Sequence, residues 1–265
     1  MSPLAETLLL SLGFTLTVMT LLWGLSVQLR NASIVDPCWG LGFVLIAWLA
    51  WYENRPTDVR AALILALTTI WGLRLSAYLT WRNQGEGEDR RYATMREHHG
   101  ARFVWISLGT VFWLQGILMW FISLPIQATI VAAKTTNAAA GGLALLDYAG
   151  LLLWCIGFAF EASGDWQMAR FKADPRNAGK VCDQGFWRYT RHPNYFGDAC
   201  QWWGVYLIAA AGGSWWTFPA PLVMTLLLLK VSGVSLLEKT IVDRRPAYAD
   251  YQARTNAFIP GPRRK

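Results

Sequence analysis

Long apolar runs are the feature that most limits how this chain can fold. Several exceed the roughly 18 residues that read as a membrane-spanning helix. Of the 265 residues, 54% are hydrophobic and only 15% are charged, whereas a soluble domain carries about 25% charged residues. Because the bilayer core offers the backbone no hydrogen-bond partners, such runs must form helices. We therefore expect an all-α, polytopic membrane protein.

The apolar runs predict about seven transmembrane helices in one domain that spans residues 1–265. Pro125 lies inside the fourth run and predicts a kink or an early end there. Two glycines and a serine at 212–214 favour a tight turn between the last two runs. The expected spans are residues 4–29, 34–52, 60–81, 103–132, 143–164, 195–213 and 216–237.

Basic residues predict the orientation of these spans. Segments 82–102, 165–194 and 238–265 hold five, six and seven Lys or Arg residues, 18 of the 24 in the chain. With seven spans, all three segments fall on one side of the membrane, and basic loops favour the cytoplasm. The N-terminus is then outside and the C-terminus cytoplasmic. We expect an integral protein of a bacterial inner membrane.

Ionisable residues inside the first three apolar runs are candidates for function, because lipid makes them costly. Asp36 lies early in the second run and Arg74 lies within the third. On a helix, Arg74 shares a face with Tyr78 and with Trp71. Internal ion pairing, or snorkelling of the long side chain, is the structural alternative.

A second polar group is expected where the fifth and sixth runs approach the basic side. Glu161 and Asp165 lie on one helical stripe, and Asn194, Tyr195 and Asp198 cluster at the start of the sixth run. These side chains predict a polar pocket with cationic loops around it. An anionic ligand would fit, although basic loops also attract anionic lipid.

Familiar cofactor and metal motifs are missing from the sequence. It contains neither a Walker A nor a G-x-G-x-x-G stretch, which argues against a Rossmann-type dinucleotide site. The four cysteines have no zinc-ligand spacing. We expect no metal.

The most distinctive stretch is Gly185–Asp198, in which Pro193 suits the first turn of a helix. Its R-H-P-N-Y-x-G-D element resembles the C-terminal motif of the membrane steroid 5-alpha-reductase and sterol reductase superfamily. Segments 36–40 (DPCWG), 71–78 (WGLRLSAY) and 87–92 (GEDRRY) resemble its bacterial branch. The resemblance extends over about residues 33–260.

This resemblance implies a seven-helix reductase that binds NADPH in a cytoplasm-facing cavity, formed mainly by the half at about 143–265. The implied reaction is hydride transfer to the 4,5 double bond of a 3-oxo-Δ4 steroid or a similar enone lipid. The implied cofactor positions are Arg74, Arg90, Arg91, Tyr92, Asp165, Lys172, Lys180, Arg191, His192, Asn194, Tyr195, Asp198 and Glu238.

The same resemblance implies Asp36 and Tyr78 as catalytic residues and Trp39 and Trp71 as substrate contacts. Hydride transfer builds negative charge on the ketone oxygen, and a donor placed there stabilises the transition state. A carboxyl in apolar surroundings can stay protonated and act as that donor. Asp36 could instead serve only at the start of its helix. Val35 stands where the steroid enzymes carry Gln, which leaves the substrate open.

Two other classes remain possible. Isoprenylcysteine carboxyl methyltransferases share an R-H-P-x-Y-x-G element and use S-adenosylmethionine, but usually carry Ser at the position of Asn194 and a Glu-Glu pair where this chain has Glu238-Lys239. A non-catalytic lipid-binding or transport protein is the third class. The expected partners are an apolar enone lipid and membrane lipid, with no nucleic acid and a monomeric state.

Overall fold

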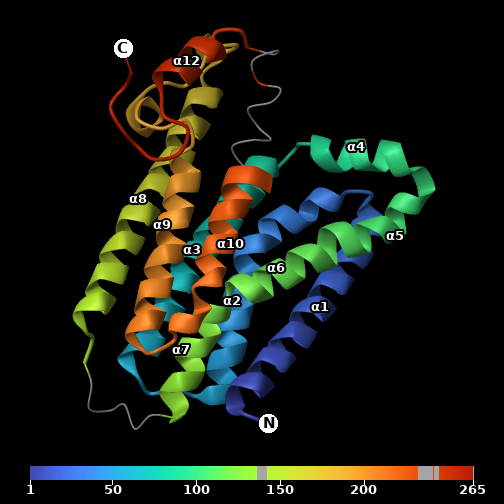
Figure 1. Ribbon diagram of the computed structural model, residues 1–265. Coiled ribbons are helices and arrows are strands. Elements are labelled where there is room, and N and C mark those ends of the chain that lie inside the picture. Colours follow the sequence, from blue (N-terminus) through green and yellow to red (C-terminus); the bar gives the residue numbers. More distant parts are fainter. Residues whose placement is uncertain (136–141, 232–240, 242–244, 265) are drawn as a thin grey trace. The chain divides into compact units, whose positions relative to one another are not determined.

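A computed structural model describes residues 1–135, 142–231, 241 and 245–264, and all regular structure within these ranges is helical (Figure 1). Five helical segments there are long and apolar enough to cross a membrane. This indicates an integral membrane protein. The five segments are Pro3–Leu29, Ala32–Asn54, Val59–Asn83, Arg90–Ile122 and Leu145–Ala173.

The chain divides into two compact units. The first comprises Met1–Leu143 with Gly212–Thr217, and the second comprises Ala144–Ala211 with Phe218–Lys265. The second unit begins at Ala144, one residue after the expected start of the cofactor-binding half at about 143, and the role of that half in binding stays a prediction. Each unit is described below by itself.

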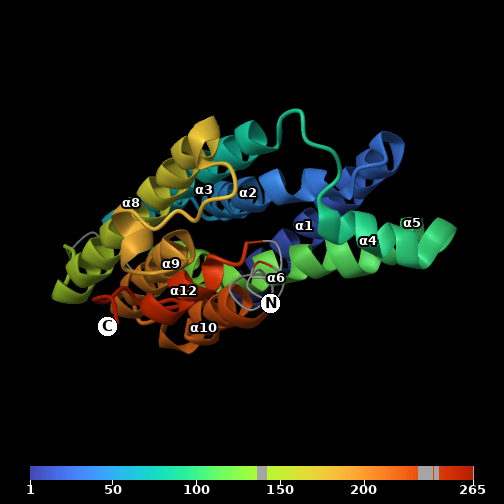
Figure 2. The same ribbon diagram turned by 90° about the horizontal axis from the view of Figure 1, so that it is seen from above.

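Three long helices open the first unit: α1 (Pro3–Leu29), α2 (Val35–Asn54) and α3 (Val59–Asn83). Helix α2 lies between α1 and α3 (Figure 2). Local signals set the ends of these helices. The Ser2 hydroxyl accepts a hydrogen bond from the Ala5 N–H, and the Asp58 carboxylate accepts one from the Arg60 N–H. Arg30, in the left-handed conformation, ends α1.

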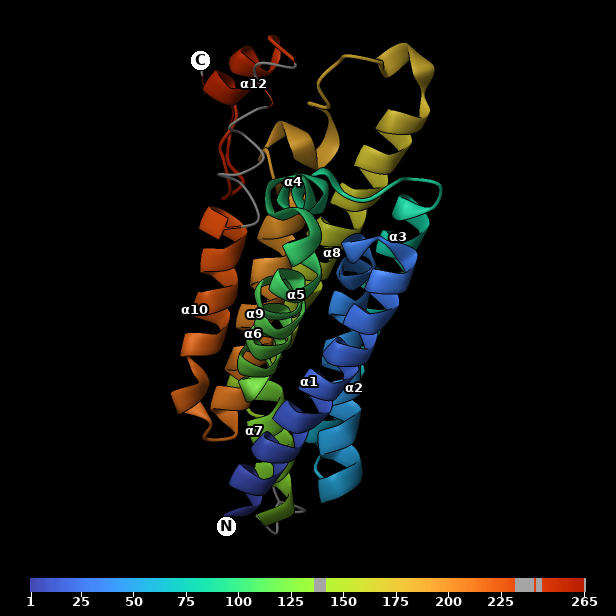
Figure 3. The same ribbon diagram turned by 90° about the vertical axis from the view of Figure 1, so that its right-hand side faces the viewer.

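The fourth apolar run is not the single span expected at 103–132. Its helical path begins earlier, with α4 (Arg90–His99) and α5 (Phe103–Ser107), and continues through a π-helical turn at Leu108–Trp113 into α6 (Leu114–Ile122). Ser123 then separates α6 from α7 (Leu124–Thr135) (Figure 3).

Pro125 explains this break. It has no N–H to donate to the carbonyl four residues earlier, and its ring clashes with that carbonyl, so the helix cannot continue unbroken through this turn. Helix α4 also means that much of the basic segment 82–102, expected as a loop, is helical. The Asp89 carboxylate starts α4 by accepting a hydrogen bond from the Arg91 N–H at 2.9 Å.

The second unit is built on two helices that pack along their lengths, α8 (Leu145–Ala173) and α9 (Pro193–Ala211) (Figure 1). Gly150 and Gly157 of α8 face the backbone of α9 so closely that an added β-carbon would lie within 3 Å of a carbonyl oxygen. Glycine at this spacing lets two membrane helices approach closely. Helix α9 begins at Pro193, as the sequence predicts, whereas α8 runs nine residues past the expected end at 164.

Shorter helices complete the second unit. Phe218 lies edge-on to Trp203 and Tyr206 of α9. It leads into α10 (Pro219–Leu226), which continues as a π-helical turn at Leu227–Val231. Helix α12 (Tyr248–Arg254) lies near the C-terminus. Among the described residues, α9 and the segment Trp215–Lys230 do not meet the length and hydropathy expected of a span, so seven spans and the orientation of the termini stay predictions.

Candidate functional site

Asp36 lies in a hydrogen-bonded cluster at the first turn of α2. One carboxylate oxygen accepts a hydrogen bond from the Tyr92 hydroxyl and the other accepts one from the Arg91 guanidinium, both at 2.7 Å. The Gln115 amide donates to the Tyr92 oxygen at 3.3 Å. Both carboxylate oxygens of Asp36 therefore accept from a strong donor, and the carboxylate fixes the direction of the Tyr92 hydroxyl.

A second layer of ion pairs holds this cluster in place. The Arg96 guanidinium donates to both oxygens of Glu88, at 2.7 and 2.8 Å, and the Ala32 N–H donates to Glu88 at 2.7 Å. The Asp89 N–H donates to the Ser33 hydroxyl at 2.6 Å. Segment 88–92 is thereby bound to the start of α2.

The pKa values of the Glu88 and Asp89 carboxyls are both lowered by their arginine partners. The hydrogen bonds from Arg96 depress the pKa of Glu88, and the N–H of Ala32 adds to the effect. For Asp89, burial alone would raise the pKa, but the hydrogen bonds and charge of Arg91 outweigh it and the pKa falls. Both groups therefore stabilise the fold as carboxylates.

The expected substrate residues form an aromatic row where α2 packs on α3. Phe43 lies edge-on to Trp39, with ring centroids 5.4 Å apart, and edge-on to Trp71 at 5.5 Å. Trp71 is buried and Trp39 is half-buried. Close to this row, Gly40 and Gly72 let the two backbones approach. The two tryptophans therefore stiffen the α2–α3 contact.

Arg74 and Tyr78 are half-buried on the same face of α3, as their spacing predicts. The Tyr78 ring packs against Trp81 and lies under the Arg82 guanidinium, 5.9 Å from its centroid. Ser76, which lies between Arg74 and Tyr78 in the sequence, accepts a hydrogen bond from the Leu41 N–H at 2.8 Å.

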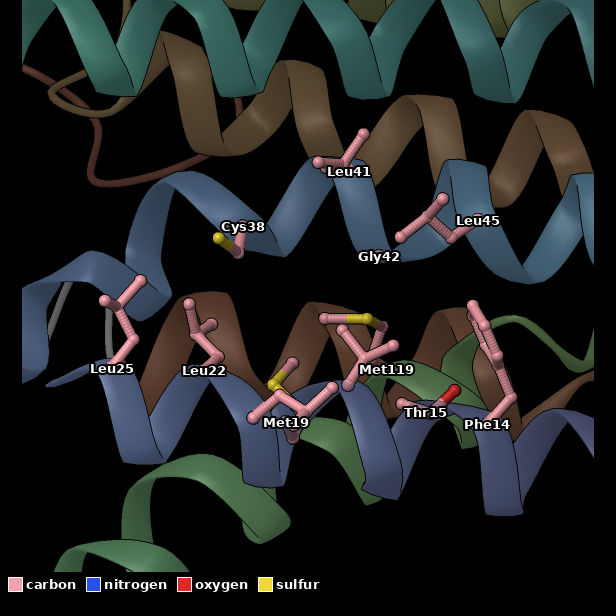
Figure 4. A pocket seen from close by; sticks show the side chains of 12 residues that line it. Phe14, Thr15, Met19, Leu22, Leu25, Cys38, Leu41, Gly42, Leu45 and Met119 are labelled. Atoms are coloured by element: carbon pink, nitrogen blue, oxygen red, sulfur yellow. The ribbon is translucent and has the colours of Figure 1, made fainter.

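An apolar cavity of about 290 Å³ separates α1 from α2 in the first unit. Figure 4 shows Cys38 of α2 and Met119 of α6 pointing into this space, opposite Met19 and Leu22 of α1. Thr15 supplies the one hydroxyl among the lining residues. Asp36, Trp39 and Trp71 do not line the cavity, and helical spacing puts Asp36 on the opposite face of α2 from the lining residues Cys38 and Leu45.

The polar stripe expected on α8 is present in the second unit. Glu161 and Asp165 are buried and both face α9. The Gln201 amide donates to Glu161 at 2.6 Å, and the Asn194 amide donates to Asp165 at 3.3 Å. The structure therefore brings together Asp165 and Asn194, which the resemblance assigned to one cofactor site.

Residues Thr190 and Arg191 hold the C-terminal segment. The Arg191 guanidinium donates to the backbone carbonyls of Gln252 and Thr255, at 3.0 and 2.5 Å, and its N–H donates to the Asn256 carbonyl. The Thr190 hydroxyl donates to the Phe258 carbonyl at 2.8 Å. These contacts give Arg191 a structural role that the sequence reading did not foresee.

The next turn of the R-H-P-N-Y element is also largely buried. The His192 and Tyr195 rings stack in parallel, 5.4 Å apart, and His192 is 5% exposed. Asp198 is buried, and Gly197 faces the Gly157 backbone of α8. Burial of this many polar groups is costly unless they are partnered. The polar side chains at the start of α9 therefore depend on partners inside the protein.

The remaining cofactor candidates lie on the basic segments. Lys172 and Lys180 are exposed, at the end of α8 and in the loop that follows, and Arg90 is exposed at the start of α4. Glu238 lies outside the described residues. Among the described residues, no group of three or more His, Cys, Asp or Glu side chains could hold a metal ion.

Sequence reasoning missed several parts of these sites. Gln115 comes from α6 and carries no motif, and the pairing of Tyr92 with Asp36 joins residues 56 positions apart. The GEDRRY resemblance did mark Tyr92, but as a cofactor residue. The apolar cavity has no sequence signal, because its lining residues are ordinary for membrane helices.

Comparisons with known proteins give a family. An uncharacterized protein of Schizosaccharomyces pombe is 27% identical over 267 residues, which cover 90% of this chain and 75% of the yeast protein. No solved structure matches the chain. A family model described as "Protein of unknown function (DUF1295)" matches residues 22–255, so this chain belongs to the DUF1295 family.

Proposed function

We propose that this protein is a membrane-embedded reductase that transfers a hydride from NADPH to the carbon–carbon double bond of an enone lipid. The 4,5 double bond of a 3-oxo-Δ4 steroid is the model substrate. The observation that carries the proposal is the Asp36–Tyr92–Arg91 cluster at the start of the helix that also walls the apolar cavity. A hydroxyl that a carboxylate holds in place can act as the donor that an enone ketone requires.

Tyr92 and Asp36 have distinct roles in this proposal. Negative charge develops on the ketone oxygen as the hydride is delivered, and the Tyr92 O–H is the donor that stabilises it. Asp36 orients that hydroxyl by accepting its hydrogen bond, and Arg91 fixes Asp36. This assignment replaces the protonated Asp36 expected from the sequence.

The cofactor groups fit NADPH in part. The buried Asp165–Asn194 pair offers a carboxylate and an amide, which suit the hydroxyls and amide of a nucleotide, and the exposed Lys172 and Lys180 suit its phosphates. Arg191 fits poorly as a phosphate ligand. The residue is only 8% exposed, and its guanidinium already donates to backbone carbonyls. When bound, NADPH supplies the hydride.

The proposal includes a topology. Seven spans would carry the three basic segments to the cytoplasmic side of a bacterial inner membrane, where NADPH is available. Helix α9, with 19 residues, is long enough for a sixth span. The protein would act as a monomer on substrate taken from the bilayer.

Cofactor binding provides the test. We expect NADPH to raise the thermal unfolding temperature of the detergent-purified protein, because a ligand at 100 times its Kd adds about 2.7 kcal/mol. NADH should stabilise less, and S-adenosylmethionine should have no effect. Stabilisation by S-adenosylmethionine without stabilisation by NADPH would favour a methyltransferase. Oxidation of NADPH in the presence of a panel of enone lipids then tests the reaction.

A further inference from the structure

A second pocket, of about 340 Å³, opens at the C-terminal end of α8 in the second unit. Ligand pockets usually start at about 300 Å³. This one mixes aromatic rings, side-chain amides and one unpaired cation. The residues that matter for its chemistry are Trp166, Gln167, Arg170, Phe171, Asn177 and Gln184.

The pocket lies on the opposite side of α8 from the proposed cofactor residues. Asp165 and Lys172 are seven residues apart and share one face, whereas Trp166 and Arg170 are four residues apart on another. At 3.6 residues per turn, Arg170 points away from the stripe of Asp165 by more than a third of a turn. The proposed cofactor residues therefore do not account for this pocket.

The loop after α8 is fixed in place by its own hydrogen bonds. The Phe186 N–H donates to the Gln167 side chain at 3.0 Å, and the Asn177 amide donates to the Phe171 carbonyl at 3.0 Å. Gly185 has a φ of +56° and contacts Gln167 where a β-carbon would clash. The pocket wall is thus formed by the chain itself, with glycine required at the turn.

Arg170 gives the pocket a net positive character. Its guanidinium lies over the Trp166 ring, 5.4 Å from the centroid, and has no ion-pair partner within the described part of the chain. The one acidic residue in the lining, Asp174, is held by the Arg176 guanidinium at 2.7 to 3.1 Å. An anion could therefore approach Arg170 without opposing charge.

The position of the pocket along α8 indicates which kind of anion it would bind. Helix α8 has 29 residues, about 43 Å at 1.5 Å per residue, whereas the hydrocarbon core is about 30 Å thick. About 13 Å of the helix thus extends beyond the core, and Asp165, Arg170 and Lys172 all lie in its last three turns, so this is the end expected among the lipid headgroups. Trp166 is 59% exposed there and carries Arg170 on its ring, an arrangement typical of an interface.

We propose that this pocket binds the phosphate of an anionic phospholipid. Arg170 pairs with the phosphate, the amides of Asn177 and Gln184 contact the polar headgroup, and Trp166 and Phe171 pack against the glycerol region. The shared chemistry is a phosphate group, which could also arrive as soluble phosphate. The interfacial position of the pocket favours lipid.

Native mass spectrometry of the full chain in detergent tests the proposal. Wild-type protein is titrated with dioleoyl phosphatidylglycerol, with dioleoyl phosphatidylcholine, and with phosphatidylglycerol in the presence of inorganic phosphate. We expect phosphatidylglycerol to bind more tightly than phosphatidylcholine. Arg170→Gln should weaken phosphatidylglycerol binding about fivefold, since one basic residue near the surface contributes about 1 kcal/mol.

Arg188→Gln is the matched control. Arg188 is exposed on the same basic segment but does not line the pocket, so its loss should leave the lipid preference unchanged. If both variants weakened phosphatidylglycerol binding equally, the lipid would be binding to a diffuse basic surface, and the proposed pocket would be overturned. Competition by millimolar inorganic phosphate, dependent on Arg170, would assign the pocket to soluble phosphate instead. Unchanged binding in Arg170→Gln, with a wild-type unfolding temperature, would also overturn it.

Discussion

Two helix pairs in this protein are packed in opposite ways. In the second unit, α8 and α9 meet backbone to backbone at Gly150 and Gly157, and buried polar side chains bridge them. In the first unit, α1 and α2 leave an apolar cavity of about 290 Å³ (Figure 4). Helices of similar composition thus form a closed seam in one place and an open one in the other.

Side-chain size accounts for the difference. Glycine at a seven-residue spacing leaves no side chain at the points of closest contact on α8, so the backbones approach and van der Waals contact replaces lipid. At the open seam, the Met119 side chain of α6 lies against Gly42 of α2, and larger side chains such as Leu22 line the α1 side. The open seam is suited to binding a ligand, and the closed seam is suited to holding a polar site rigid.

The largest expected effect lies at the start of α2, one of the two helices of the open seam. Asp36→Asn keeps the size of the side chain but weakens its hold on Tyr92 and Arg91, and Tyr92→Phe removes the proposed donor. We expect each change to lower kcat for an enone lipid about 100-fold, the usual scale for a positioned proton donor. Stabilisation by NADPH should persist. Wild-type turnover in Tyr92→Phe would remove this residue from the mechanism.

The closed seam should respond in stability. Gly157→Ala places a β-carbon against the Gly197 carbonyl, which is backbone and cannot move aside. We expect a loss of about 2 kcal/mol in the free energy of unfolding, measured by denaturation in mixed micelles. Gly13→Ala in α1 is the matched control, because nothing lies within 4 Å of its β-carbon. Equal stability of the two variants would contradict the close packing of α8 and α9.

A smaller effect is expected in the ion pairs that anchor the Asp36 cluster. The folded-state pKa of Glu88 is depressed, so its carboxylate stabilises the fold above the unfolded-state value of about 4.3. That contribution is lost as the pH falls through the lower, folded-state value. Unfolding temperatures should therefore be steady from pH 7 to about pH 5 and then decline.

Arg96→Gln tests this interpretation. Loss of two hydrogen bonds to Glu88 should cost about 1 kcal/mol at pH 7 and make the acid-induced decline shallower, because the folded-state pKa of Glu88 moves toward its ordinary value. Arg102→Gln, an exposed arginine of the same segment, is the control. An identical pH profile in Arg96→Gln and wild type would argue against the pairing.

The smallest effect is expected from the same glycine-to-alanine change at the open seam. The β-carbon of Gly42→Ala would meet the sulfur and methyl of Met119, the free end of a flexible side chain. We expect a cost below about 1 kcal/mol, since Met can change rotamer. A threefold rise in KM with unchanged kcat, roughly what lost ground-state binding gives, would connect the cavity with substrate. A cost as large as that of Gly157→Ala would mean that both seams are closed.

Much of the fold could be predicted from local sequence. The apolar runs correspond to helices, Pro193 starts α9, and Pro125 breaks the fourth run as its missing N–H requires. The stripe of Glu161 and Asp165 is buried as its spacing predicts. These features depend on neighbours a few residues away, so periodicity and backbone chemistry are enough to find them.

The candidate sites were less predictable. The resemblance to known motifs marked Asp36, Tyr92 and Arg191, but it did not give their contacts. Tyr92 donates to Asp36 and lies under the Arg91 guanidinium, and Arg191 donates to carbonyls of the C-terminal segment. Each contact joins residues more than 50 positions apart, which no local pattern encodes.

The sequence by itself determined that this is a helical membrane protein with three basic segments and a few costly polar residues in its apolar runs. Lipid leaves the backbone no alternative to helix, so composition alone decides that much. Only the tertiary structure decided which polar residues meet and where α1 and α2 stay apart. Those outcomes depend on how side chains from distant helices fill or fail to fill the same space.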